Sequence, residues 1–346
     1  MRILITGGLG LVGCSYAAHC LKRHDDVFIL DNWARGSASE LNAQWLSNIV
    51  PKPVIMRGSV SNKDDVMNVL SAAGWVDAVI HAAAQSSVNV SLHDPYLDFQ
   101  SNVLGTFNVL EGLRTVCPQA CMVFIASNKV YDTTAWPVER VGTRYRWIGR
   151  SVGPSDTFPF HTDAKEPYGA SKISGLYYSR CYAALYNMPI VCLVPSGMFG
   201  RRQYGKTEQG WLGWFVIATE LGLPITIFGD GFQVRDMLDV RDVNTALDVL
   251  LYIAPGYKGG VFNLGGGPSN AISLIEALTK ISELTGKAPK VEYTDWRPQD
   301  NKVYISNCAK LISLGWSPTI GLEQGIADLV GWVKDERVNI QTVYGV

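Results

Sequence analysis

Short apolar runs alternate with longer amphipathic stretches over the first half of the chain. The apolar runs predict buried strands at Arg2–Thr6, Asp26–Asp31, Val54–Arg57, Ala78–His81, Met122–Ala126 and Ile190–Val194. The stretches between them predict helices at Leu11–Lys22, Lys63–Ala73, Val103–Cys117 and Ser171–Tyr186. Because strands that alternate with helices form βαβ units, we expect an α/β fold with a doubly wound parallel sheet and helices on both faces.

The pattern changes near residue 195. Glycine, proline and aromatic residues become denser over 197–213, 222–231 and 259–267, and helical periodicity becomes less regular. We therefore predict a larger domain over residues 1–194, with later segments returning to its sheet, and a smaller C-terminal α/β domain over 195–346. The segment Asp132–Pro167 is rich in Trp, Arg and Pro and has little periodicity, which is typical of a functional or disordered loop.

Composition narrows the class of protein. The chain has 346 residues, of which 47% are hydrophobic, so it can bury a large core and is not intrinsically disordered. A net charge of -1 argues against a nucleic-acid-binding surface. No run of about 18 uncharged apolar residues predicts a membrane span, and the N-terminal MRILITGG is typical of a buried strand and not of a signal peptide.

The cysteines indicate a reducing compartment and do not indicate a metal site. There are seven, an odd number, and they lie mostly inside apolar patterns without the spacing of zinc ligands. We therefore predict no metal site, and buried thiols in the reducing cytoplasm.

A glycine-rich turn follows the first predicted strand. Gly7, Gly10 and Gly13 are spaced GxxGxxG and open the first predicted helix, whose N-terminal N–H groups can bind a pyrophosphate. Asp31 ends the second strand, where a carboxylate accepts a hydrogen bond from a ribose 2′-hydroxyl and repels a 2′-phosphate. This favours NAD as cofactor, although the nearby Arg35 leaves NADP open.

A second motif contains a pair of ionisable side chains. Tyr168 and Lys172 are four residues apart in YGASK, so on a helix they share one face. A nearby ammonium stabilises the phenolate, which predicts a tyrosine base usable near neutral pH. Ser127, at the end of a predicted strand in FIASNKVY, is placed at the carboxyl edge of the sheet, where ligands bind in open α/β sheets.

Together these motifs resemble the extended short-chain dehydrogenase/reductase family, whose members act on nucleotide sugars. The resemblance covers essentially the whole chain and implies a Rossmann-type sheet, NAD, and a C-terminal domain that binds the substrate. It implies that Ser127 hydrogen-bonds the reacting sugar hydroxyl, that Tyr168 is the base, and that Lys172 holds the nicotinamide ribose. These three are the predicted catalytic residues.

The resemblance also implies wider binding sets. The predicted cofactor-binding residues are Gly7, Gly10, Leu11, Val12, Asp31, Asn32, Arg35, Ser59, Val60, Ala82, Ala83, Ala84, Asn102, Tyr168 and Lys172. The predicted substrate-binding residues are Gln85, Ser127, Asn128, Lys129, Ser196, Gln209, Trp211, Arg235 and Arg297. Arg235 and Arg297 match arginines that bind the diphosphate, a role that guanidinium geometry suits.

Several segments narrow the predicted reaction. Asn128 and Lys129 stand where dehydratases of this family have an acidic pair, which disfavours sugar dehydration. The segments SNKVY, RRQYGKTEQGWLGWF, FGDGFQVRDMLDV, FNLGGGPSN and DWRPQDNKVYISN are similar to those of CDP-paratose 2-epimerases. This similarity implies NAD-dependent epimerisation at C2 of a CDP-sugar, through a keto sugar that is reduced again on its other face.

Three alternatives remain open. The first alternative to a CDP-sugar 2-epimerase is another nucleotide-sugar epimerase, such as a UDP-sugar 4-epimerase. The second is a decarboxylase of the same family. A non-catalytic NAD-sensing module is disfavoured because both Tyr168 and Lys172 are present.

The family also implies a homodimer through Val103–Cys117 and Ser171–Tyr186, the latter with Tyr177, Tyr178, Tyr182 and Leu185 exposed. Neither a nucleic acid nor a membrane is an expected partner.

Overall fold

The chain forms two compact units, each assembled from three segments. A computed structural model describes residues 1–161, 166–297 and 300–346. Unit 1 comprises Met1–Val130, Phe160–Val194 and Asn244–Phe262. Unit 2 comprises Tyr131–Pro159, Pro195–Val243 and Asn263–Val346. The two units are described separately.

A seven-stranded sheet dominates the described residues of unit 1, in the order β12-β8-β5-β4-β1-β2-β3. Its strands are β1 (Arg2–Thr6), β2 (Asp26–Asp31), β3 (Val54–Arg57), β4 (Ala78–His81), β5 (Cys121–Ile125), β8 (Ile190–Pro195) and β12 (Val261–Leu264). The pairs from β3 to β8 are parallel. The order reverses at β1, as in a doubly wound Rossmann-type sheet, which is the predicted fold class.

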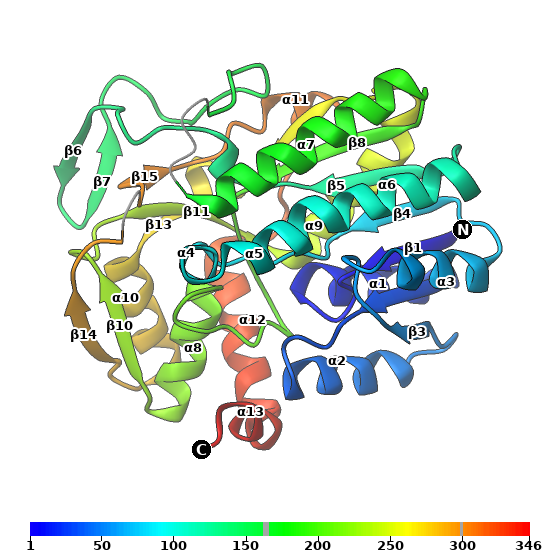
Figure 1. The fold of residues 1–346 in the computed structure, drawn as a ribbon. Coiled ribbons are helices and arrows are strands. Elements are labelled where there is room, and N and C mark those ends of the chain that lie inside the picture. Colours follow the sequence, from blue (N-terminus) through cyan, green and yellow to red (C-terminus); the bar gives the residue numbers. More distant parts are fainter. Residues whose placement is uncertain (162–165, 298–299) are drawn as a thin grey trace. The chain divides into compact units, whose positions relative to one another are not determined.

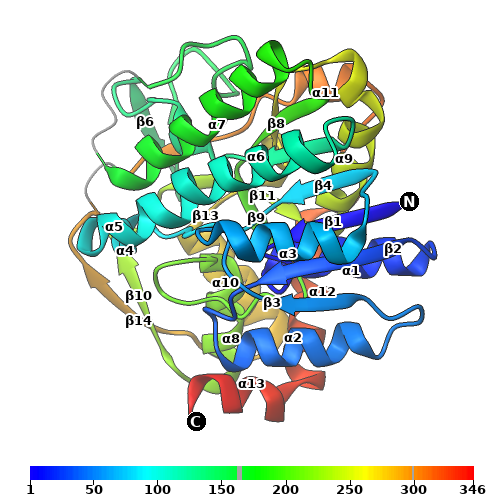
Figure 2. The same cartoon turned by 45° about the vertical axis from the view of Figure 1, so that its right-hand side comes forward.

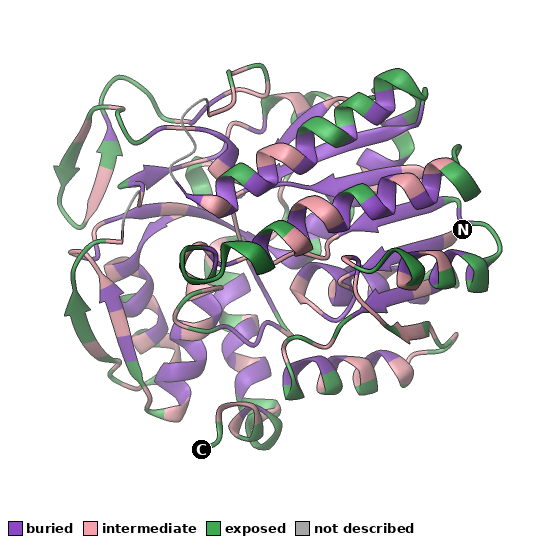
Figure 3. Cartoon of the chain, in the orientation of Figure 1, coloured by how far each residue is buried: buried purple, intermediate pink, exposed green. Residues whose placement is uncertain are grey.

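Helices cover both faces of this sheet (Figures 1 and 2). One face carries α3 (Lys63–Ala73), α6 (Gly105–Val116) and α7 (Pro167–Leu185), and the other carries α1 (Leu11–Lys22) and α9 (Val240–Ile253). The remaining elements are α2 (Ser37–Ser47), α4 (Val88–His93), α5 (Pro95–Asp98), a π-helix η1 (Phe99–Leu104), and the short 3₁₀ turns η2 (Asn128–Val130) and η3 (Ala254–Gly256). Figure 3 shows the sheet buried between these layers.

Unit 2 contains small sheets and a group of helices. Its strands are β6 (Val138–Val141), β7 (Arg144–Trp147), β9 (Gly197–Phe199), β10 (Pro224–Phe228), β11 (Val234–Asp239), β13 (Ala271–Ser273), β14 (Lys290–Thr294) and β15 (Val303–Tyr304). Its helical elements are α8 (Trp211–Leu221), η4 (Pro268–Asn270), α10 (Leu274–Thr285), α11 (Ala309–Ser313), α12 (Leu322–Asp335) and α13 (Arg337–Tyr344). The helices α10 and α12 are regular, contrary to the expectation from the sequence.

The segment Asp132–Pro167 is not entirely loop. Residues 138–147 form the antiparallel hairpin β6–β7, whose strands pair Val138 with Trp147 and Val141 with Arg144. The apolar alternation that would have predicted these strands is weak because most of their residues are charged or exposed. Residues 162–165 of this segment lie outside the described part of the chain.

The thiols and the helices agree with the compositional analysis where they are described. Five of the seven cysteines are buried, Cys121 is half-buried and Cys181 is exposed, and all are free thiols. Among the described residues, none of the helices has the length and apolar character that a membrane span requires.

Candidate active site

The glycine turn has the tight geometry that the motif predicts. Gly7 has a φ of +68°, and a Cβ on it would lie 2.7 Å from the backbone of Ala83, so only glycine fits there. A Cβ on Gly13 would lie 2.3 Å from the Gly7 carbonyl oxygen, which explains the close packing of α1 against the turn. At Gly10, the N-cap of α1, the nearest atom to such a Cβ is 3.4 Å away.

This turn fits a dinucleotide. No side chain of the described residues caps the N-terminus of α1, so the N–H groups of its first turn, including Leu11 and Val12, are left for a ligand. The open face at Gly10 lets an anion approach them, and the helix dipole favours its negative charge. The residues present therefore fit the pyrophosphate of NAD.

Asp31 ends β2 beside this turn and is almost completely buried. Its carboxylate accepts hydrogen bonds from the Leu9 N–H and the Trp33 N–H, both at 2.9 Å. Burial raises the pKa of Asp31, whereas these bonds and the Arg35 charge lower it. The neighbouring Asn32 accepts from Ala34 N–H at 3.0 Å. The carboxylate is thus fixed in orientation at the end of the strand.

The other predicted cofactor residues lie in unit 1 along neighbouring strand ends. Ser59 pairs with Ser61 through their hydroxyls at 2.8 Å, and the Val60 carbonyl accepts from Asn108 Nδ2 at 2.9 Å. After β4, Ala82 N–H donates to the Thr6 carbonyl at 3.1 Å and Ala83 N–H to the Thr6 hydroxyl at 3.4 Å. Ala84 follows in the same half-buried stretch.

The three predicted catalytic residues come together in unit 1. Ser127 follows β5, and its side chain lies close enough to the Tyr168 phenol, near the start of α7, to lower the pKa of that phenol. Lys172 lies one turn further along α7 and donates to the Ile125 carbonyl at 2.9 Å. All three side chains are buried, so their chemistry takes place away from bulk water.

Burial opposes the expected ionisation of the base. It raises the pKa of Tyr168 to about 12, the charges of Glu166 and Asp98 act in the same direction, and the Ser127 hydrogen bond lowers it. Burial also lowers the pKa of Lys172 to about 8. In the chain alone the pKa of the phenol therefore stays above neutral pH, because desolvation by burial outweighs the lowering effect of Ser127.

Asn102 is buried in the π-helix η1. Its Oδ1 accepts from the Gln85 N–H, and its Nδ2 donates to the Ser171 hydroxyl, both at 2.9 Å. The Asp98 carboxylate accepts from Nδ2 as well, at 3.1 Å. Sequence reasoning missed Asp98 and Ser171; the signal was their spacing, since Asp98 precedes Asn102 by one turn and Ser171 lies within YGASK.

The remaining substrate candidates of unit 1 are engaged within the protein. Gln85 uses both ends of its amide, since Nε2 donates to Asp98 at 2.8 Å and Oε1 accepts from Ser87 N–H at 2.5 Å. Asn128 Oδ1 accepts from the Ser127 hydroxyl at 3.4 Å, and Lys129 follows it in the turn η2. The two positions directly after Ser127 thus carry an amide and an ammonium, and neither is acidic.

Unit 2 holds the two predicted diphosphate arginines. Arg235 on β11 donates to Asp300 at 2.6 Å, and Arg297 donates to the Thr207 carbonyl at 2.7 Å while stacking 3.9 Å from the Phe228 ring. Burial lowers the pKa of Arg297, the Asp300 and Glu208 carboxylates act against this, and the Arg235 charge lowers it further. The buried Arg297 Nε has no hydrogen-bond acceptor among the described residues.

The other candidates in unit 2 have structural partners. The Ser196 hydroxyl donates to the buried Asp236 carboxylate at 2.5 Å. Gln209 pairs with Lys206 through backbone hydrogen bonds, and Trp211 at the start of α8 stacks on Phe215 at 5.3 Å. These contacts leave Arg297 as the residue of this group with an unused buried donor.

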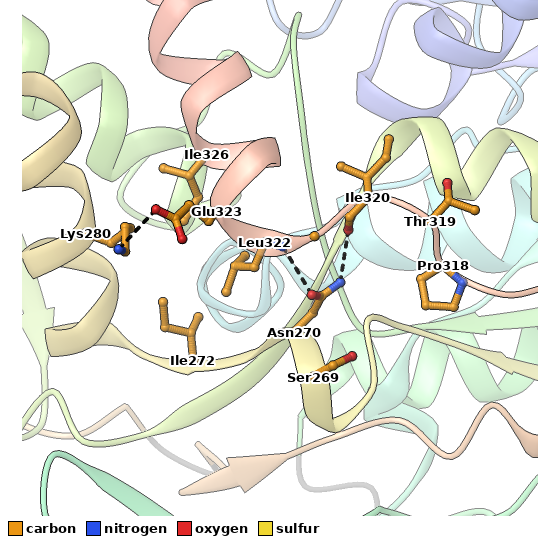
Figure 4. A pocket seen from close by; sticks show the side chains of 11 residues that line it. Ser269, Asn270, Ile272, Lys280, Pro318, Thr319, Ile320, Leu322, Glu323 and Ile326 are labelled. Carbon is orange, nitrogen blue, oxygen red and sulfur yellow. Dashed lines mark hydrogen bonds and ion pairs between the residues drawn. The ribbon is translucent and has the colours of Figure 1, made fainter.

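A separate cavity of about 560 Å³ lies in unit 2, between η4, α10 and the start of α12 (Figure 4). Asn270 Nδ2 donates to the Ile320 carbonyl at 3.2 Å, and its Oδ1 accepts from the Leu322 N–H at 3.2 Å. Lys280 forms ion pairs with Glu323 and Glu283. None of the residues predicted for catalysis or binding lines this cavity.

Comparison with known proteins agrees with this architecture. A model of the "NAD dependent epimerase/dehydratase family" matches residues 3–265. The CDP-paratose 2-epimerase of Salmonella typhi is 30% identical over 343 residues, covering 96% of this chain and 99% of that protein. The UDP-glucose 4-epimerase of Mycolicibacterium smegmatis is 28% identical, covering 97% and 99%. The structure of the Thermus thermophilus UDP-glucose 4-epimerase in complex with NAD superimposes with a TM-score of 0.81 at 30% identity, covering 96% and 99%.

Proposed function

Because the chain belongs to the NAD dependent epimerase/dehydratase family, we propose that it is a nucleotide-sugar epimerase of the CDP-paratose 2-epimerase type. Family membership confirms the predicted α/β fold class, the cofactor NAD and the kind of enzyme. The proposal adds that the substrate is a CDP-sugar and that the reacting carbon is C2. Whole-length similarity to a CDP-paratose 2-epimerase supports this substrate.

The observation that carries the proposal is the grouping of three buried side chains, with Ser127 acting on the Tyr168 phenol and Lys172 one turn further along α7. Tyr168 takes the proton from the sugar hydroxyl, and Ser127 orients that hydroxyl through a hydrogen bond. Lys172 stabilises the phenolate with its ammonium. NAD, when bound, would accept a hydride from the reacting carbon of the sugar and later return it to the same carbon. Tyr168 then gives the proton back to the oxygen when the sugar is reduced on its other face.

The bound cofactor also bears on the ionisation of Tyr168. The nicotinamide ring of NAD⁺ is cationic, and a positive charge near a buried phenol favours the phenolate. Because burial raises the pKa of Tyr168 to about 12 in the chain alone, the positive charge of bound NAD⁺ would favour its ionisation.

The residues after Ser127 distinguish epimerisation from dehydration. Elimination of water needs a carboxylate to take a proton and a carboxylic acid to protonate the leaving hydroxyl. Asn128 and Lys129 occupy these positions and offer an amide and an ammonium instead. Oxidation and re-reduction at one carbon needs only the tyrosine base, so the residues present suit an epimerase.

Arg235 and Arg297 of unit 2 are proposed to bind the diphosphate of the substrate. The Arg297 guanidinium is mostly buried, and its Nε has no acceptor among the described residues, so an anionic phosphate oxygen would satisfy it. A second candidate function, epimerisation at C4 of a UDP-sugar, is favoured by the similarity to UDP-glucose 4-epimerases. Both functions use the same catalytic residues and differ in the sugar pocket and the base.

We also propose a homodimer formed through α6 and α7. Their outer sides carry exposed Phe107, Tyr177, Tyr178 and Leu185, and Figure 3 shows exposed residues along α7. Phe107 and Tyr178 stack with ring centres 5.9 Å apart. The sequence expectation was wrong for Tyr182, which is buried because its hydroxyl donates to Glu111 at 2.7 Å.

The experiment that tests the function is a substrate comparison followed by proton NMR. The purified protein with NAD is incubated separately with CDP-paratose, CDP-glucose and UDP-glucose. A changed coupling between H1 and H2 on a CDP-sugar is the expected result. Changes confined to the couplings of H4 on the UDP-sugar would replace the proposal with the 4-epimerase alternative.

A Tyr168→Phe variant separates an enzyme from an NAD-sensing module. It removes the proton acceptor, so turnover is expected to fall by about 10²–10⁴-fold while NAD binding is kept. Exposed Tyr252→Phe, at the end of α9, makes the same atomic change outside the site and serves as the control. Equal turnover of the two variants would show that Tyr168 is not the base.

A further inference from the structure

A buried carboxylate lies beside the catalytic residues without belonging to the predicted set. Asp98 is the last residue of α5 and is only 1% exposed. Its Oδ1 accepts hydrogen bonds from Gln85 Nε2 at 2.8 Å and from Asn102 Nδ2 at 3.1 Å. A buried carboxylate is costly unless it has such donors or a cation nearby, so its position needs a reason.

The hydrogen bonds of Asp98 join three parts of unit 1. Gln85 belongs to the stretch after β4, and Asn102 belongs to the π-helix η1. Asn102 Nδ2 also donates to the Ser171 hydroxyl on α7 at 2.9 Å, and that hydroxyl donates to the Tyr168 carbonyl at 2.9 Å. The network therefore reaches the backbone of the residue that carries the catalytic phenol.

The charge of Asp98 acts on both catalytic ionisable groups. It raises the pKa of Lys172 against the lowering effect of burial, and it contributes to the raised pKa of Tyr168. Burial raises the pKa of Asp98, and the Gln85 hydrogen bond and the Lys172 charge act against that rise. Lys172 is 5% exposed and donates to a neutral carbonyl, so Asp98 supplies a negative charge where the ammonium has lost its water.

The other titratable groups around this pair do not replace Asp98. His81, at the end of β4, is repelled by Lys172, and burial lowers its pKa to about 3, so it is neutral. Glu166, at the N-cap of α7, acts on Tyr168, and burial raises its own pKa while Lys129 lowers it. On α4, His93 is exposed and is hydrogen-bonded to the Asn89 carbonyl at 2.8 Å.

We propose that Asp98 is a positioning residue of the active site, which keeps the buried Lys172 ammonium charged and holds Ser171 and Asn102 in place beneath Tyr168. The inference rests on the proposed function for the roles of Tyr168 and Lys172, and it adds the group that maintains their charge state. A charged Lys172 is what a phenolate needs as its partner, so loss of Asp98 changes the pH range in which the pair can work.

The test is a titration of Lys172 that does not require turnover. The full chain is labelled with ¹³C at lysine Cε, and the Lys172 signal is assigned by its absence from a Lys172→Arg variant. In Asp98→Asn, which keeps the shape and an acceptor oxygen, the Lys172 titration is expected to move to lower pH by about one unit. Asp98→Ser, which also removes the charge, is the second variant in case the first does not fold.

Two further variants are matched controls. Asp98→Glu retains the charge, so the Lys172 titration is expected to stay near its wild-type position. Asp94→Asn makes the same chemical change at the exposed N-cap of α5, where asparagine caps as well as aspartate, and is expected to leave Lys172 unchanged. A Lys172 titration that stays in place in folded Asp98→Asn or Asp98→Ser overturns the proposal.

Kinetics separate this proposal from the proposed function. Where a CDP-sugar is turned over, both limbs of the pH–rate profile are expected to move to lower pH in Asp98→Asn, because Asp98 raises the pKa of both groups. A purely structural role would lower the rate without moving the limbs, which refutes the charge role. A moved Lys172 titration without any CDP-sugar turnover supports Asp98 and rejects the substrate assignment.

Discussion

Replacing Gly13 with alanine should weaken both the fold and the binding of NAD. The added Cβ would lie 2.3 Å from the Gly7 oxygen, 2.7 Å from Gly8 Cα and 2.9 Å from Gly7 C. Ordinary contacts of a Cβ begin near 3.4 Å, so α1 and the turn must separate by about 1 Å. All three neighbours are backbone atoms, and no side-chain rotation can relieve the contact.

The magnitude follows from two opposing terms. Overpacking in a tight region costs about 1–3 kcal/mol, and the backbone contact places Gly13 near the upper end. Alanine in a helix gains about 1 kcal/mol over glycine. We therefore expect the free energy of unfolding to fall by about 1–2 kcal/mol. The same shift moves the N–H groups at the start of α1, so NAD affinity should fall as well.

Gly331→Ala is the matched control. Gly331 lies inside α12, and nothing lies within 4 Å of its virtual Cβ, so this variant should gain about 0.5–1 kcal/mol. Urea unfolding without NAD measures the first effect, and calorimetric titration with NAD measures the second. Gly13→Ala that is as stable as Gly331→Ala and binds NAD like the wild type would refute the argument from close packing.

Three further perturbations follow from the structure. Arg297→Ala should raise the KM for the nucleotide sugar about 10–100-fold with little change in kcat, since a charge-assisted hydrogen bond contributes about 1.5–3 kcal/mol; an unchanged KM would place the diphosphate elsewhere. Asp236, whose pKa burial raises from 3.8 to about 6, stabilises the fold fully below pH 4 and loses this contribution as the pH rises to 6. The free energy of unfolding of Asp236→Asn, measured with urea, should therefore rise by about 3 kcal/mol relative to that of the wild type between pH 4 and pH 7. A difference between the two proteins that does not change with pH would contradict the raised pKa of Asp236. Leu185→Asp should convert a dimer to a monomer in sedimentation, whereas a monomeric wild type at micromolar concentration would end the dimer proposal.

The strands of the sheet were predicted accurately because they are short apolar runs, and most of them are buried. β1 to β4 begin and end at the predicted residues, because their apolar runs are bounded by polar residues, turns or glycines. β5 is shifted by one residue toward the N-terminus relative to the prediction, and β8 extends one residue further, to Pro195. The helix α7 begins at Pro167, four residues before the predicted start, since proline is favoured in a first turn but contributes nothing to apolar periodicity.

The grouping of the three candidate catalytic residues was predictable from the sequence, whereas their ionisation was not. Spacing placed Ser127, Tyr168 and Lys172 together, because strand ends and helix turns have fixed geometry. It could not give the pKa of Tyr168, which depends on how completely the surrounding chain excludes water. Nor could it reveal Asp98, whose partners come from three elements distant in sequence.

The π-helix η1 has a consequence for the helix that contains it. The segments α5, η1 and α6 follow one another without a break from Pro95 to Val116. A π turn holds one residue more than an α turn, so the residues before it are rotated by about 100° relative to a regular continuation of α6. Deleting one residue of the π turn would restore regular winding and would rotate α5, with Asp98 at its end, by about 100° about the helix axis relative to α6. The extra residue of the π turn thus sets how far α5, which ends at Asp98, is rotated about the helix axis relative to α6.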